Sequence, residues 1–172
     1  NRAARELGIA PVTRTPGRPT SHSVVERMVR TALEKTRPTL LQSGVDLGWA
    51  ARAVKHALLV RRLKVKNEAG LAIYEQKHGN ITKARISPYG ASLEFEPTPE
   101  QMDSNKAAPR AMQGIMVGCH LQPGGAWSGD FYCALLQHFE SSTNRRRIRV
   151  YRTKTVDWGV GQRPFFPIFD SK

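Results

Sequence analysis

Apolar residues in the first third of the chain recur at the three- and four-residue steps of an amphipathic helix. Between residues 20 and 43 they are Val25, Met28, Val29, Ala32, Leu33, Leu40 and Leu41. Ser21 or Ser23 suits the N-cap, and Gly44 is a natural stop. Pro38 has no amide hydrogen to donate, so we expect it to kink or split this helix near residues 34–37.

Two shorter helices are expected next. One covers residues 47–63 and has an apolar and a polar face. The apolar face holds Trp49, Ala50, Ala53, Val54, Ala57 and Leu58, and the polar face holds Arg52, Lys55, His56 and Arg62. The other covers residues 71–77 and ends at Gly79. At helical spacing, a large aromatic ring such as Trp49 is expected in the core.

After residue 80 the pattern changes to the alternation that is typical of strands. The expected strands cover residues 92–96, 113–120, 131–136 and 147–153. A turn centred on Ala126 would place Cys119 opposite Cys133. Two cysteines are too few for a disulfide framework, so we expect both as free thiols of an intracellular protein.

Together these elements predict an α/β or α+β chain in three parts. Residues 1–80 are mainly helical, residues 81–158 form a small β-rich module, and residues 159–172 are a tail or linker. No apolar run approaches the length of about 20 residues that spans a bilayer, so we expect no membrane partner. The chain opens without a methionine, on residues that resemble the end of a helix entering a strand, and we expect it to be part of a longer protein.

The charge changes this picture. The formal net charge is +13, and residues 1–66 hold 14 Lys and Arg against 4 Asp and Glu. Such a balance favours a partner that is a polyanion. A second basic run follows late in the chain, and its cations suit either of two roles, which are protection of a strand edge or binding of phosphates. On the second interpretation the nucleic-acid contacts are Arg145, Arg146, Arg147 and Arg149.

One carboxylate, Glu26, stands among cations at the start of the first helix, close to Arg18, Arg27 and Arg30. The residues alone leave two interpretations open. A surface carboxylate balanced by Arg27 or Arg30 is the simpler one, and such pairs contribute little. The other is a metal ligand that lies close to a phosphate backbone.

The same segment carries a family resemblance. Pro19-x4-Val24-Val25-Glu26-Arg27-x2-Arg30-Thr31-x-Leu33 resembles the last conserved block of retroviral-type integrases, in their copia-type retrotransposon branch. Further segments are similar to that branch in order and spacing: Leu40-Leu41-x2-Gly44, Trp49-x3-Ala53, Tyr74-Glu75-x3-Gly79, Pro88-Tyr89-Gly90 and Arg110-Ala111-x2-Gly114-Ile115-x-Val117-Gly118.

The resemblance implies the C-terminal part of a ribonuclease H-like integrase core, and DNA integration by metal-dependent transesterification. In such integrases three carboxylates, Asp, Asp and Glu, hold two Mg²⁺ or Mn²⁺ ions, and Glu26 matches the third. The residues expected to hold DNA phosphates are Arg18, Arg30 and Lys35. DNA and other integrase protomers are the implied partners, and the nucleus is the expected location.

Two departures bear on activity. The family carries Asn-Gly where this chain has His22-Ser23, and the loss of glycine would stiffen the loop. The positions of both aspartates fall before Asn1, so we expect the chain as given to bind DNA without cutting it. A non-catalytic nucleic-acid-binding remnant, or a co-opted module, is the alternative.

Overall fold

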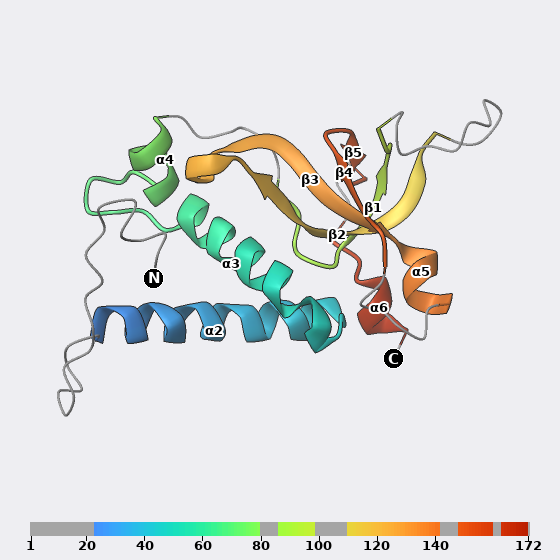
Figure 1. The fold of residues 1–172 in the computed structure, drawn as a ribbon, viewed down its shortest axis with the longest axis horizontal. Coiled ribbons are helices and arrows are strands. Elements are labelled where there is room, and N and C mark those ends of the chain that lie inside the picture. Colours follow the sequence, from blue (N-terminus) through green and yellow to red (C-terminus); the bar gives the residue numbers. More distant parts are fainter. Residues whose placement is uncertain (1–22, 80–85, 99–109, 142–147, 160–162, 172) are drawn as a thin grey trace, which may run out of the picture. The chain divides into compact units, whose positions relative to one another are not determined.

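The computed structural model describes residues 23–79, 86–98, 110–141, 148–159 and 163–171. The chain divides into two compact units, residues 1–31 and 32–172, and each is described by itself. In the first unit the described residues are the N-terminal part of helix α2 (Ser23–Ser43), and residues 23–30 are all exposed. The second unit holds the remaining elements (Figure 1).

Helix α2 is a single helix of 21 residues with Pro38 inside it, so the predicted split is wrong, whereas the predicted kink near residues 34–37 stays a prediction. Proline removes one amide donor from the helical ladder, and two threonine hydroxyls close to it bond to carbonyls one turn earlier. The hydroxyl of Thr36 donates to the Ala32 carbonyl at 2.7 Å, and that of Thr39 donates to the Lys35 carbonyl at 2.8 Å.

The predicted helix stop at Gly44 is confirmed. This residue has a φ of 67°, and its amide donates to the Leu40 carbonyl at 3.1 Å. A Cβ atom at this position would lie 2.5 Å from the backbone nitrogen of Phe169, so only glycine fits.

The two shorter helices also form where the pattern predicts them. A 3₁₀ turn, η2 (Leu47–Trp49), leads into α3 (Ala50–Lys64), and Asp46 caps it by accepting from the Gly48 amide at 2.8 Å. Helix α4 (Ile73–His78) ends at Gly79, which has a φ of 77°.

Five strands form one open antiparallel sheet in the order β4-β3-β2-β1-β5. They are β1 (Ser92–Phe95), β2 (Met112–Leu121), β3 (Trp127–Leu135), β4 (Val150–Thr153) and β5 (Val156–Asp157). The short helices α5 (Leu136–Ser141) and α6 (Pro167–Asp170) complete the described elements. Helices with an antiparallel sheet are compatible with the α+β class that the sequence predicts.

The register of the long β2–β3 hairpin corrects one prediction. The turn is made by η4 (Pro123–Gly125), whereas Gly129 lies inside β3 with a φ of 86°. Cys119 therefore pairs with Phe131, and Cys133 pairs with Met116, with a register shift between Met116 and Gly118. Both cysteines are free thiols, as predicted.

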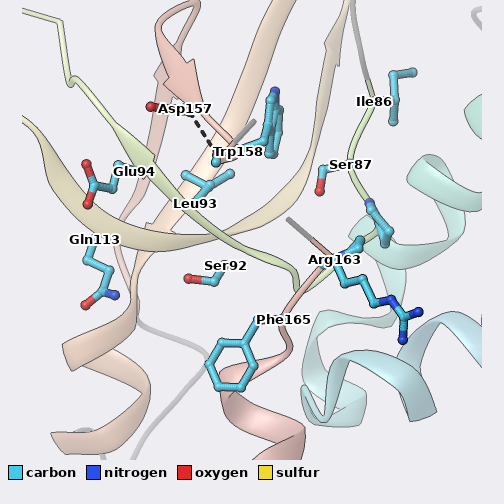
Figure 2. Close-up of a pocket in the computed structure, with 13 residues that line it drawn as sticks. Ile86, Ser87, Ser92, Leu93, Glu94, Gln113, Asp157, Trp158, Arg163 and Phe165 are labelled. Carbon is cyan, nitrogen blue, oxygen red and sulfur yellow. Dashed lines mark hydrogen bonds between the residues drawn. The ribbon is translucent and has the colours of Figure 1, made fainter. Parts of the chain in front are cut away.

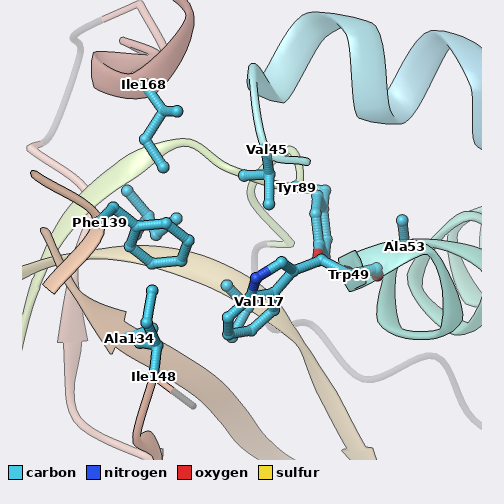
Figure 3. Packing of buried hydrophobic residues seen from close by; sticks show 10 residues of the cluster. Val45, Trp49, Ala53, Tyr89, Val117, Ala134, Phe139, Ile148 and Ile168 are labelled. Carbon is cyan, nitrogen blue, oxygen red and sulfur yellow. Dashed lines mark hydrogen bonds between the residues drawn. The ribbon is translucent and has the colours of Figure 1, made fainter. Parts of the chain in front are cut away.

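The core joins the predicted helical and β-rich segments within the second unit (Figure 3). Trp49 is buried, as predicted, and its ring centroid lies 5.3 Å from that of Phe139 in α5. The same cluster contains Val45, Ala53, Tyr89, Ile115, Val117, Ala134, Ile148 and Ile168. Ile168 belongs to the segment predicted as a tail or linker, so the described part of that segment packs onto the unit.

A second buried cluster contains residues of α3, α4 and all strands except β5. It consists of Leu59, Tyr74, Leu93, Phe95, Met116, Trp127, Phe131, Cys133, Leu135 and Tyr151. Tyr74 anchors α4 to the hairpin, because its hydroxyl accepts from the Trp127 amide at 2.7 Å. Figure 1 shows α3 running beside this hairpin. This packing holds in place the last turn of α3, which carries Arg61, Arg62 and Lys64.

Candidate nucleic-acid interface

The first unit holds two of the predicted site residues in its described part. Glu26 lies in the first turn of α2, and Arg30 lies one helical turn further on the same face. Both side chains are exposed. A carboxylate in this turn is favoured by the positive end of the helix dipole, which is a structural reason for its presence. Arg18 lies outside the described residues.

A magnesium site needs several oxygen ligands around one point. Among the residues that the structure describes, no three His, Cys, Asp or Glu side chains are grouped so that they could hold a metal ion. A Mg²⁺ or Mn²⁺ site that includes Glu26 therefore stays a prediction, because its other ligands would have to come from outside the described residues.

In the second unit, Lys35 lies at a cavity of about 410 Å³ between α2, α3 and residues 86–89. Among the described residues, Arg61 and Lys64 also line it, both from the last turn of α3. Among the described residues that line this cavity there is no Asp or Glu. We call it the cationic cavity. Arg149 is not among its lining residues.

The sequence pattern alone does not distinguish Arg61 and Lys64 from the other cations of residues 1–66. Their signal is the spacing Arg61-Arg62-x-Lys64-x-Lys66 at the end of a helix, where the dipole favours cations. Arg62, which lies between them in the sequence, packs against the hairpin turn. A Cβ atom added at Gly125 in that turn would lie 3.3 Å from the Arg62 guanidinium. Only the structure separates the cations that line the cavity from those that support the hairpin turn.

The prediction that His56 lies on the polar face of its helix is wrong, because this residue is buried at the cationic cavity. This residue lines the cavity together with residues 86–89, but it is only 4% exposed. Its ring centroid lies 5.7 Å from that of Tyr89. Burial lowers the pKa of His56 to about 4, so the imidazole is neutral at pH 7. Its Nδ1 atom is buried and has no hydrogen-bond partner among the described residues.

The late basic run serves at least partly to support the fold. Arg149 is exposed, and its guanidinium lies over the Tyr151 ring, 5.0 Å from the centroid. Arg152 is bound to the buried carboxylate of Asp130, and Lys154 lies 3.8 Å from the same group. Strand β4 is at one edge of the sheet, where cations also oppose unwanted pairing. Arg145, Arg146 and Arg147 lie outside the described residues.

A larger cavity, of about 590 Å³, lies at the opposite edge of the sheet (Figure 2). Two carboxylates line it, Glu94 and Asp157, which are directly paired residues on β1 and β5. Asp157 accepts a hydrogen bond from the Gly159 amide at 2.9 Å. One cation, Arg163, is also present. Because two carboxylates repel phosphates, this cavity suits a polyanion less well than the cationic cavity does.

No family model, curated protein or solved structure shows significant similarity to this chain. Among the described residues, no helix has both the length and the apolar character that a membrane span requires.

Proposed function

We propose that this chain is a DNA-binding segment of a copia-type retrotransposon integrase. The observation that carries the binding proposal is the set of cations at the cationic cavity, Lys35, Arg61 and Lys64, with no carboxylate among the described residues that line it. The net charge of +13 adds long-range attraction for a polyanion. Lysine and arginine bind phosphates independently of base sequence by releasing counterions.

For the intact protein we propose the family activity, which is integration of DNA by transesterification in the nucleus. This part rests on the ordered segments that resemble the family, from Pro19 to Gly118. In that setting Glu26 is one of three carboxylates, and the other ligands and protomers come from outside the described residues. For this chain alone we propose DNA binding without catalysis.

A non-catalytic nucleic-acid-binding remnant, or a co-opted module, is the second candidate. One observation favours it. Ser23, which stands where the family has glycine, is the first residue of α2, so this position is helical. Strand-transfer assays of a longer protein that includes the upstream residues separate the two candidates. Activity that is lost in Glu26→Gln supports the integrase, and inactivity of the longer protein supports the remnant.

DNA binding is tested by fluorescence anisotropy with a labelled duplex. Combined replacement of Lys35, Arg61 and Lys64 by alanine is expected to weaken binding roughly tenfold or more at low salt. The matched control replaces three exposed cations that do not line the cavity, Arg37, Lys55 and Arg110. An equal loss in both triple variants would contradict a localised site, and absence of any binding would contradict the proposal as a whole.

A further inference from the structure

The cationic cavity offers more than a surface for phosphates. Its volume of about 410 Å³ lies within the range of about 300–1,000 Å³ that is usual for sites of small organic ligands. Apolar side chains from α3 line it, namely Ala57, Val60 and Leu63. Its cations come from two different helices, Lys35 from α2 and Arg61 and Lys64 from α3. A ligand that satisfies both features has an apolar body and an anionic group.

The backbone of duplex DNA satisfies only half of this description, because its bases are stacked and paired. An unpaired nucleotide satisfies both halves, since its base has an apolar face and its phosphate is anionic. Side chains that can bond the edge of a base also line the cavity, and they are Thr39, Gln42 and Ser87.

We propose that the cationic cavity holds one unpaired nucleotide of a DNA strand, with the base against Val60 and Leu63 and the phosphate at Lys35, Arg61 and Lys64. This inference rests on the proposed DNA binding and adds to it a preference for single-stranded or unpaired DNA.

The unpartnered Nδ1 atom of His56 supports a ligand with polar edges. A buried nitrogen without a hydrogen-bond partner is unfavourable, and such groups in native proteins call for an explanation. A base that enters the cavity can supply a donor or an acceptor to the imidazole once the ring turns towards it. A purely apolar ligand cannot do so.

The test compares three probes of equal length by fluorescence anisotropy: a thymidine strand, an abasic strand and a duplex. The abasic strand keeps the phosphates and removes the bases. We expect the thymidine strand to bind the full chain at least fivefold more tightly than the abasic strand, which is the lower end of the usual effect of one stacked base. Thymidine monophosphate should also shift the NMR signals of the His56 imidazole, whereas inorganic phosphate should leave them in place.

A variant that fills the cavity tests the contribution of the base to binding separately from that of the phosphate. Ala57→Leu adds a side chain that lines the cavity, and Ala51→Leu makes the same change at an exposed position of the same helix. The first is expected to abolish the preference for the thymidine strand, and the second to retain it. Circular dichroism checks the fold, and Val60→Phe takes the place of Ala57→Leu if the latter does not fold.

The outcomes separate this inference from the function on which it rests. Equal binding of the thymidine and abasic strands, or a preference that survives filling of the cavity, overturns the nucleotide site and leaves DNA binding intact. Absence of binding to all three probes overturns both. Binding to phosphatidylserine vesicles, with no response to the nucleotide, also overturns the inference and assigns the cavity to an anionic lipid.

Discussion

Arg152 binds the carboxylate of Asp130, with Nε donating to Oδ2 at 3.0 Å and a second nitrogen donating to the same oxygen. The Asp130 side chain is 4% exposed, whereas that of Arg152 is 48% exposed. Asp130 lies on β3 and Arg152 on β4, so the pair joins the edge strand to the sheet. Arg152, which belongs to the late basic run of the sequence, therefore stabilises the fold.

Removal of the Asp130 charge is expected to destabilise the protein. Burial alone would raise the pKa of Asp130, but the hydrogen bonds and charge of Arg152 outweigh it and hold the pKa below its usual range. The stabilisation is present above the unfolded pKa of about 3.9 and is lost as the pH falls through the lower folded pKa. Asp130→Asn should cost about 1–3 kcal/mol at pH 7, measured by urea unfolding. A cost no greater than that of Glu94→Gln, at an exposed carboxylate, would contradict the role of the pair.

A separate pH dependence is expected from His56. Its folded pKa of about 4 lies below the ordinary value of 6.5, so the unfolded chain binds the proton more readily. Stability is complete above pH 6.5 and falls as the pH is lowered towards 4, by about 1.4 kcal/mol for each unit of the pKa difference.

His56→Phe keeps a ring in place and removes this titration. Urea unfolding at pH 7, 5.5 and 4.5 should show a flatter pH profile for the variant than for the parent, and His138→Gln serves as the control. Identical profiles for His56→Phe and the parent would show that His56 is not buried in its neutral form.

The two thiols are expected to be unreactive in the folded protein. Burial raises the pKa of Cys119 to about 12, and burial together with the neighbouring Cys119 raises that of Cys133 to about 12. Since the thiolate is the nucleophile, labelling by a disulfide reagent at pH 8 should be slow until urea unfolds the chain. The Cys119→Ser and Cys133→Ser variants assign each signal, and rapid labelling of either thiol without urea would contradict the packing described.

Two glycines with similar backbone angles test the packing of the C-terminal segment. Gly44 and Gly79 have φ of 67° and 77°, so alanine costs about 1 kcal/mol or more at either position. A Cβ atom at Gly44 would also meet the backbone of Phe169, whereas one at Gly79 would meet none of the described residues within 4 Å.

Gly44→Ala should therefore lower the free energy of unfolding by at least about 1 kcal/mol more than Gly79→Ala does. Urea unfolding of the two variants measures the difference. Equal costs would indicate that Phe169 does not pack against the end of α2 in solution.

The elements that the sequence predicts well are those with local signals. Gly44 and Gly79 end helices because each adopts a positive φ, which is a local property that glycine supplies. The hairpin register was wrong because two glycine-containing segments compete for one turn, and Pro123–Gly125 forms it. His56 was misplaced because the residues that cover it are about 30 positions away in the sequence. Tertiary contacts of this kind have no periodicity in the chain.

The candidate site also combines features that the sequence predicts with features that only the structure shows. The excess of cations is visible in the composition, but the cavity exists only where α2, α3 and residues 86–89 meet. Lys35 was predicted from the family resemblance, and the structure places it beside Arg61 and Lys64. The role of Glu26 as a metal ligand stays a prediction, because it depends on groups outside the described residues.

The measurement that tests the central claim most directly is the affinity of the chain for duplex DNA as a function of salt. If Lys35, Arg61 and Lys64 contact phosphates, the logarithm of the association constant should fall linearly with the logarithm of the salt concentration. Replacement of the three cations by alanine should reduce the slope by about 2.7, because each phosphate contact contributes about 0.9. An affinity that does not depend on salt, or a slope that the three replacements leave unchanged, would contradict nucleic-acid binding at this site.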